Sequence, residues 1–230
     1  MSLFNLLYLN TVLRAAAIAV VVLAAIAPSV RASSFQPPDD TAPRESTGGA
    51  SRTSGLCPED PIGSDALVPL IPDTNHGYTV SDRPTIFVYV PETTASEAYF
   101  SLEDEDYMPV FQTTVPVPAG GGLVAISVPD SAPTLEADKD YRWMFTLKCD
   151  DRIRAGYPLV GGWISRYDGN VNAQGSPAEM ADAYGRAGIW YDGLAALALA
   201  VQSEPDNQAL VANLEEFLGS AGVQGAIARF

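Results

Sequence analysis

Residues 141–147 constrain the fold more than any other stretch of the chain. Large apolar side chains alternate there with polar or more flexible ones. The large apolar residues are Tyr141, Trp143, Phe145 and Leu147. A period of two places all four large groups on one face of a single strand. Because such a face has to be covered by other parts of the chain, the stretch predicts a sheet with one side in a hydrophobic core.

Further strand signals flank this stretch and are separated by prolines and glycines. Residues 85–90 form a β-branched and aromatic run between Pro84 and Pro91, which is typical of a strand with little water on either face. Residues 116–122 predict a loop rather than a tight hairpin. Short strands are also predicted at 98–102, 110–115, 123–128 and 160–165. At least six strands about a dozen residues apart predict an antiparallel, immunoglobulin-like β-sandwich over residues 56–172.

The period changes to that of a helix after Gly175. Ser176 and Pro177 supply an N-cap and a proline at the first helical position. Apolar residues then recur at helical spacing as far as Val201, and Pro205 interrupts the pattern before a second helix over 210–218. The sequence therefore predicts a mainly β chain that ends in a helical hairpin, residues 173–230, packed on the sandwich.

The first 32 residues are predicted to be a signal peptide. An apolar run from Ala15 to Ala27 is too short for a comfortable membrane span, and Val30-Arg31-Ala32 is a pattern that a signal peptidase could cut after Ala32. An uncleaved N-terminal anchor is the alternative that the sequence leaves open. Residues 33–55 contain Phe35 as their one large apolar side chain and are predicted to be a disordered linker.

The acidic balance of the chain argues against two classes of partner. The chain has 28 acidic against 13 basic side chains and a formal charge of −15. Removing the leader takes away Arg14 and Arg31 and no acid, which leaves 11 basic side chains and a charge of −17. Such a surface repels phosphate and anionic lipid, so no nucleic-acid partner is expected, and no membrane partner once the leader is cleaved.

Cys57 and Cys149 are the two cysteines of the chain. In an exported protein an even count predicts a disulfide. The alternative is a pair of reactive thiols, but the chain lacks the CxxC spacing and the neighbouring histidine that such thiols use. We therefore expect a structural bridge and a periplasmic or extracellular location.

Several stretches together resemble one family, catalogued from cyanobacteria as domain of unknown function 928 (DUF928). They are residues 48–57, 66–69, 84–91, 123–129, 141–150, 162–166 and 188–192. The resemblance spans nearly the whole chain after the leader. It implies an exported protein with no assigned activity, so no catalytic residues can be carried over from it.

The residues indicate no catalytic constellation and no cofactor. His76, the single histidine, lies in Asn75-His76-Gly77 and is interpreted as an exposed turn residue. One histidine excludes a zinc site built on histidines, and no Gly-x-Ser-x-Gly elbow or phosphate-binding loop accompanies it. We therefore expect no catalytic residues and no resident metal.

Two weaker binding candidates stand out. Glu103, Asp104 and Asp106 belong to an acidic run that could ligate calcium, although the run lacks the spacing of an EF-hand, and a solvated hairpin turn is the alternative interpretation. Trp163 follows Gly161-Gly162 and is a candidate ligand contact. Trp143 and Trp190 lie on apolar faces and are assigned to the core.

These patterns predict a non-enzymatic envelope module that binds another envelope protein. An exposed apolar groove on the helical part would favour this function, whereas full burial of the helices would oppose it. A carbohydrate or cell-wall binding module is the first alternative, and it requires an aromatic face open to solvent beside polar groups. A carboxylate-dependent hydrolase is the second, and it requires two acids about 5–10 Å apart in a cleft.

Overall fold

A computed structural model of the chain describes residues 33–38, 57–61, 64–154 and 156–223. The predicted signal peptide and most of the predicted linker lie outside these ranges. Within them, no helix is long and apolar enough to cross a membrane.

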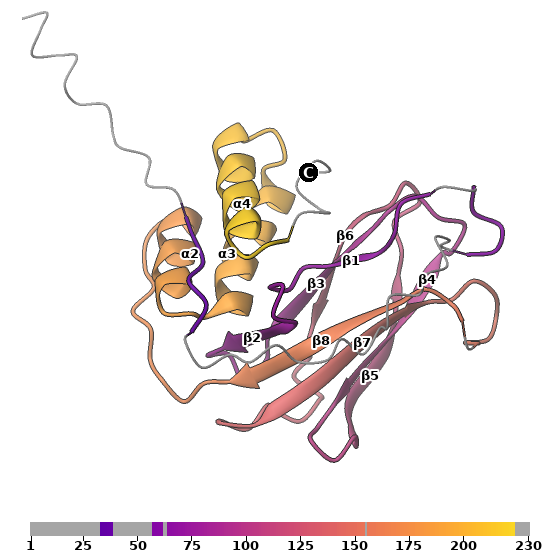
Figure 1. The fold of residues 1–230 in the computed structure, drawn as a ribbon, viewed down its shortest axis with the longest axis horizontal. Coiled ribbons are helices and arrows are strands. Elements are labelled where there is room, and N and C mark those ends of the chain that lie inside the picture. The colour runs from indigo at the N-terminus through magenta and orange to yellow at the C-terminus, as the bar shows by residue number, and fades with distance from the viewer. Residues whose placement is uncertain (1–32, 39–56, 62–63, 155, 224–230) are drawn as a thin grey trace, which may run out of the picture. The chain divides into compact units, whose positions relative to one another are not determined.

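The described residues form two sheets and three C-terminal helices, arranged as in Figure 1. The smaller sheet has the order β1 (Val68–Pro69), β3 (Thr85–Val90), β6 (Gly122–Ser127). The larger sheet has the order β2 (His76–Thr79), β8 (Leu159–Arg166), β7 (Asp140–Leu147), β4 (Glu97–Glu103), β5 (Pro109–Pro116). The mainly β class is confirmed, while the immunoglobulin-like assignment stays a prediction.

The six predicted strands are all present, within one or two residues of their expected bounds. Residues 116–122 carry the chain from β5 in one sheet to β6 in the other, so they form a loop as predicted. Two short strands were missed, β1 and β2. The antiparallel prediction is wrong for one pair, because β2 runs parallel to β8. Parallel neighbours need a long crossover, and about 80 residues separate these two strands along the chain.

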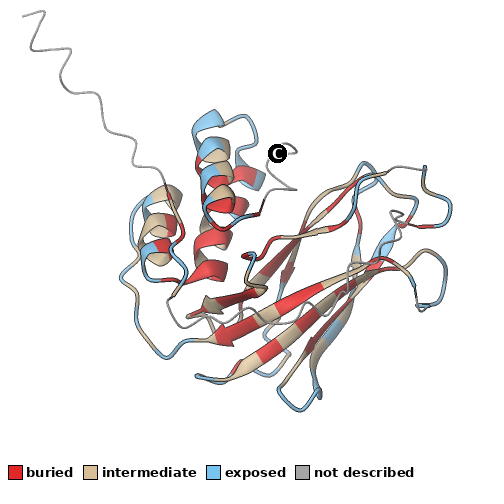
Figure 2. Ribbon diagram, in the orientation of Figure 1, coloured by how far each residue is buried: buried red, intermediate tan, exposed pale blue. Residues whose placement is uncertain are grey.

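Strand β7 confirms the pattern that constrained the fold. Its residues alternate strictly between buried and half-buried, and Trp143, Phe145 and Leu147 are completely buried (Figure 2). Gly162 lies opposite Trp143 in the register with β8. A Cβ atom at Gly162 would lie 2.3 Å from Cδ1 of Ile71 and 3.2 Å from Cζ2 of Trp143. A side chain at residue 162 would therefore displace Ile71 and press on the Trp143 ring.

The helical part contains α2 (Pro177–Arg186), α3 (Trp190–Ser203) and α4 (Gln208–Ser220). The predicted N-terminal cap is confirmed, because Ser176 and Glu179 form a capping box. The two-helix hairpin is wrong, since the first predicted helix is split in two. Gly188 adopts a φ of +72° and Ile189 is extended, forming a bridge to Tyr78 of β2. The apolar spacing continues across this break, which is why the sequence did not reveal it.

Buried hydrogen bonds connect α3 to the larger sheet and to the segment before β2. Nε1 of Trp143 donates to the Tyr191 hydroxyl (2.7 Å), which donates to the Trp163 carbonyl (3.0 Å). Nε1 of Trp190 donates to the Leu70 carbonyl (3.0 Å). Burial raises the pKa of Tyr191, so its hydroxyl stays protonated. Helices and sheets therefore share one hydrophobic core.

Residues 33–38, called the strap below, lie beside α2 in Figure 1. Phe35 is only 5% exposed, and its ring meets those of Trp190 and Phe217 at centroid distances of 5.0 and 6.2 Å. The prediction of a disordered linker is therefore wrong for residues 33–38. The Phe35 ring is buried in a slot between the helices. The average composition of a segment does not predict that a single side chain will be buried in this way.

Candidate functional site

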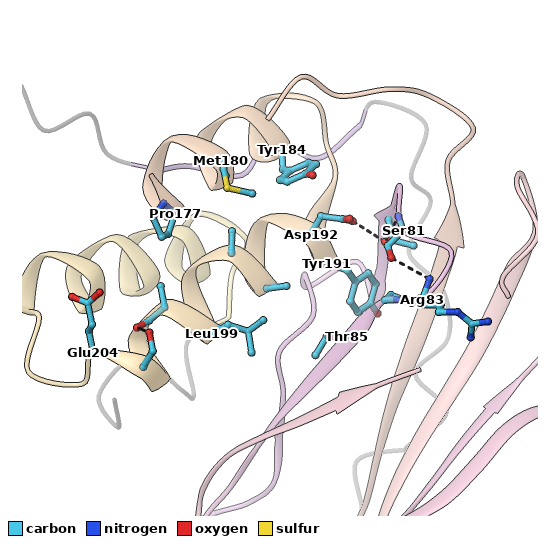
Figure 3. Close-up of a pocket in the computed structure, with 16 residues that line it drawn as sticks. Ser81, Arg83, Thr85, Pro177, Met180, Tyr184, Tyr191, Asp192, Leu199 and Glu204 are labelled. Atoms are coloured by element: carbon cyan, nitrogen blue, oxygen red, sulfur yellow. Dashed lines mark hydrogen bonds between the residues drawn. The ribbon is translucent and has the colours of Figure 1, made fainter. Parts of the chain in front are cut away.

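A groove of about 580 Å³ opens between the helices and the strands (Figure 3). One wall is the β2–β3 segment, residues 79–85. The other wall comes from α2 and α3. Its principal side chains are those of Pro177, Met180, Tyr184, Ala195 and Leu199. This wall is largely apolar, and Leu199 is 48% exposed although it is a large aliphatic side chain.

Asp192, in the first turn of α3, joins the two walls. Its Oδ2 atom accepts hydrogen bonds from the Thr79 hydroxyl (2.7 Å) and the Val80 amide (3.1 Å). Burial raises the pKa of Asp192 above its ordinary value, and the bonds from Thr79 and Val80 act in the opposite direction. The carboxyl group thus holds the β2–β3 segment against α3. Its Oδ2 atom is already engaged in these hydrogen bonds.

The Asp192→Asn variant is expected to remove one component of the pH dependence of stability. A carboxyl whose pKa is raised by folding stabilises the folded state most fully below its ordinary pKa of 3.8. That contribution is lost as the pH rises through the folded-state pKa. An asparagine oxygen can accept the same two bonds without titrating. Urea unfolding between pH 3 and pH 8 should show wild-type stability falling relative to Asp192→Asn as the pH rises; parallel curves would contradict this role.

Arg83 and Tyr184 are two further polar residues of the groove, and they differ in whether their polar groups already have partners. Arg83 donates from Nη1 to the carbonyls of Pro129 and Ala132 and forms an ion pair with Asp130 (3.4 Å), so its charge is compensated. The Tyr184 hydroxyl has no hydrogen-bond partner within the described ranges. Burial, and secondarily the charge of Asp192, raise the pKa of Tyr184. The groove therefore offers an apolar wall and a neutral phenol.

A second pocket, of about 410 Å³, lies near the end of the strap. Its lining consists of Pro38, Tyr78, Asp138, Tyr167, Ala187 and Ile189. Tyr167 is 49% exposed, and its ring meets that of Tyr78 edge-on at 6.4 Å. Within the part of the chain that the structure describes, the Asp138 carboxylate makes no hydrogen bond or ion pair. An exposed ring beside an open carboxylate suits a polar ligand with a flat apolar face.

The family model described as Domain of Unknown Function (DUF928) matches residues 47–229. The chain belongs to the DUF928 family. The match includes both sheets, all three helices and the whole lining of the groove, whereas the strap precedes it. No curated protein matches this DUF928 chain.

His76 of the DUF928 chain is not the exposed turn residue that the sequence suggested. It lies on β2 and is 2% exposed. Its Nε2 atom lies 2.6 Å from the Ser165 hydroxyl, which donates to Asp140. The serine lies between the imidazole and the carboxylate, whereas in a catalytic triad the imidazole lies in the middle. We interpret the three residues as a hydrogen-bonded chain that connects β2 with β7 and β8, in which His76 and Ser165 are buried and Asp140 is half-buried.

The acidic candidates Glu103, Asp104 and Asp106 do not converge on a common point. Glu103 forms an ion pair with Arg142 (2.6 Å), and Asp104 Oδ1 accepts from the amides of Asp106 (3.0 Å) and Met108 (2.8 Å). Across the described residues, no group of three or more His, Cys, Asp or Glu side chains is placed to hold a metal ion. The stretch forms the hairpin turn between β4 and β5, the alternative that the sequence left open.

The candidate ligand contact Trp163 lies outside the linings of both pockets. It is half-buried on β8, and its carbonyl oxygen accepts from Tyr191. The groove also lacks the carboxylate pair of a hydrolase. Among the described residues that line it, the two acids are Asp192, in the first turn of α3, and Glu204, the C-cap of that helix; they are twelve residues apart, or about 18 Å along the helix axis at 1.5 Å per residue. That separation exceeds the roughly 5–10 Å of glycosidase pairs.

The predicted disulfide is present between Cys57 and Cys149, whose Cα atoms are 5.3 Å apart. It connects the segment before β1 to the end of β7. Such a bond is consistent with an oxidising location.

Proposed function

We propose that this DUF928 protein is an exported, non-enzymatic module that binds an extended segment of another envelope protein in the groove. The observation that carries the proposal is the open apolar wall of α2 and α3, with Leu199 48% exposed at its edge. Helices fully buried against the sheets would have left no such surface. The volume, about 580 Å³, lies within the range of small binding sites.

The charge of the chain indicates what kind of segment the groove accepts. The whole chain carries a formal charge of −15, and Arg83, the one basic residue among the described residues that line the groove, is already paired with Asp130. Glu204 contributes a carboxylate at the far end of the groove. A segment with small apolar side chains and a lysine or arginine complements these features.

The export part of the proposal rests on two observations. The first is the disulfide between Cys57 and Cys149, because disulfides persist in oxidising compartments and are rare in reducing ones. The apolar run and the small-x-small pattern that ends at Ala32 have the order of a cleavable leader. We therefore propose the periplasm or the cell exterior as the location.

Binding of two synthetic octapeptides tests the proposal. Both carry leucine and alanine at the same positions; one has two lysines and the other two glutamates. We expect the lysine peptide to bind the mature protein in isothermal titration calorimetry and the glutamate peptide to bind at least about tenfold more weakly. Leu199→Gln should weaken binding of the lysine peptide about tenfold, because burying a leucine side chain contributes about 1.5–3 kcal/mol.

Ile153→Gln is the matched control, because Ile153 is an equally exposed aliphatic residue (49%) outside the groove. This variant should bind the lysine peptide like the wild type. Failure of the wild type to bind either peptide, or equal binding by Leu199→Gln, would contradict the proposed function.

Carbohydrate binding at the second pocket is the other candidate function. It is favoured by the exposed ring of Tyr167 beside the open carboxylate of Asp138, a pairing that can stack on a sugar and accept its hydroxyls. A β-linked glucose hexasaccharide tests this alternative. If it binds wild type and Leu199→Gln equally while neither peptide binds, the binding function belongs to this pocket rather than to the groove.

A further inference from the structure

The strap is bound to all three helices. The Ser33 hydroxyl donates to the Ala178 carbonyl of α2 (3.0 Å), and the Gln36 amide donates to the Gly185 carbonyl at the other end of the same helix (3.0 Å). Between these two contacts, the Phe35 amide donates to the Ser220 hydroxyl of α4 (2.8 Å). The Phe35 ring packs on Trp190 of α3. The strap therefore holds α2 against α3 and α4.

Two glycines make room for the strap. A Cβ atom at Gly185 would lie 2.3 Å from the Ser34 carbonyl oxygen, and one at Gly188 would lie 2.6 Å from Cγ of Pro38. Both distances are shorter than any real contact of a Cβ atom. The C-terminal end of α2 and the turn after it are thus shaped to receive the strap backbone.

Helix α2 presents one stripe of residues to the strap and the neighbouring stripe to the groove. Ala178 and Gly185 face the strap, while Met180 and Tyr184 line the groove. Helix α2 packs mainly on α3 and to a lesser extent on α4 rather than on the sheets, so its position is fixed by these two helices together with the strap. A displacement of the strap would consequently move one wall of the groove.

We infer that the strap is a regulatory element that sets the position of α2 and thereby the affinity of the groove. This inference rests on the proposed function where it concerns binding. Docking of the strap and occupation of the groove are then coupled, and by linkage each favours the other by the same factor. The strap precedes the family-matched range, so the regulation belongs to the part of the chain outside the DUF928 match.

Two variants undock the strap from opposite sides of its interface. Phe35→Ala removes the ring from the slot, and Gly185→Ala places a methyl group against the Ser34 carbonyl. Gly120→Ala is the control for the glycine change, because nothing lies within 4 Å of a Cβ atom there. Phe111→Ala is the control for the aromatic change, because Phe111 is a half-buried residue of the edge strand β5.

The first readout requires no ligand. Hydrogen exchange of the α2 amides should accelerate at least about tenfold in Phe35→Ala and Gly185→Ala, with β7 unchanged, and neither control should show this pattern. Chymotrypsin should also cut after Phe35 faster in Gly185→Ala than in Gly120→Ala. Unchanged α2 exchange in both strap variants would overturn the inference.

The second readout uses the lysine octapeptide. Strap variants should bind it at least about fivefold more weakly than wild type, and saturating peptide should slow cleavage after Phe35 in wild type by a similar factor. Equal affinity of wild type and strap variants would overturn the coupling. A third outcome separates the two proposals. If the strap variants show faster α2 exchange but the wild type does not bind the peptide, the strap does hold α2 in place and the proposed function is refuted.

Discussion

Replacing both Cys57 and Cys149 with alanine is expected to lower the free energy of unfolding by about 4–5 kcal/mol. The two residues are 92 positions apart, so the bridge closes a long loop and removes many conformations from the unfolded chain. Domains of this kind are stable by only about 5–15 kcal/mol, so the expected loss is about a third or more of that stability.

Urea unfolding at neutral pH measures this loss directly. Wild-type protein unfolded with and without a reductant provides the control, and the reduced wild type should behave like the double variant. A loss below about 1 kcal/mol would contradict the stabilising role, because it would mean that the unfolded chain gains almost no freedom when the bridge is absent.

Trp190→Ala is expected to destabilise the protein by about 3–5 kcal/mol. The Trp190 ring is completely buried, stacks on Phe217 at 5.0 Å and donates to the Leu70 carbonyl. Truncation would leave a cavity where the strap, α3 and α4 meet. It would also leave the Leu70 carbonyl without this donor.

Comparison with Trp190→Phe separates these two contributions in thermal or urea unfolding. The phenylalanine variant keeps an aromatic ring and loses the donor, so it should cost only about 1–3 kcal/mol. Trp163→Ala is the matched control, because Trp163 is half-buried and does not belong to the hydrophobic core cluster of the described residues, which includes Trp190. Equal losses for Trp190→Ala and Trp163→Ala would contradict the central position of Trp190.

The strands were predictable because their signal is local. Alternation over 141–147 reports which face of β7 is buried, and prolines delimit β3. Strand β2 escaped prediction because His76-Gly77-Tyr78-Thr79 has no apolar alternation and pairs with residues almost 90 positions away. The same distant pairing buries His76. Its interpretation as an exposed turn residue was wrong because the neighbouring sequence does not reveal a pairing with so distant a strand.

The site was less predictable than the fold. The groove forms only because residues 79–85 pack beside helices that begin almost 100 residues later. The break at Gly188 leaves the helical spacing of apolar residues intact, so three helices looked like two. The strap was hidden by its own composition, and Phe35 in a polar segment was the one local signal that could have revealed it.

Binding in the groove is tested most directly by a heteronuclear NMR titration of the mature, oxidised protein with the lysine octapeptide. We expect the largest amide shift changes in residues 79–85 and in the groove-facing residues of α2 and α3, with Tyr167 and Asp138 unaffected. Shift changes centred on Tyr167 and Asp138, or none at all, would contradict the assignment of the groove as the binding site.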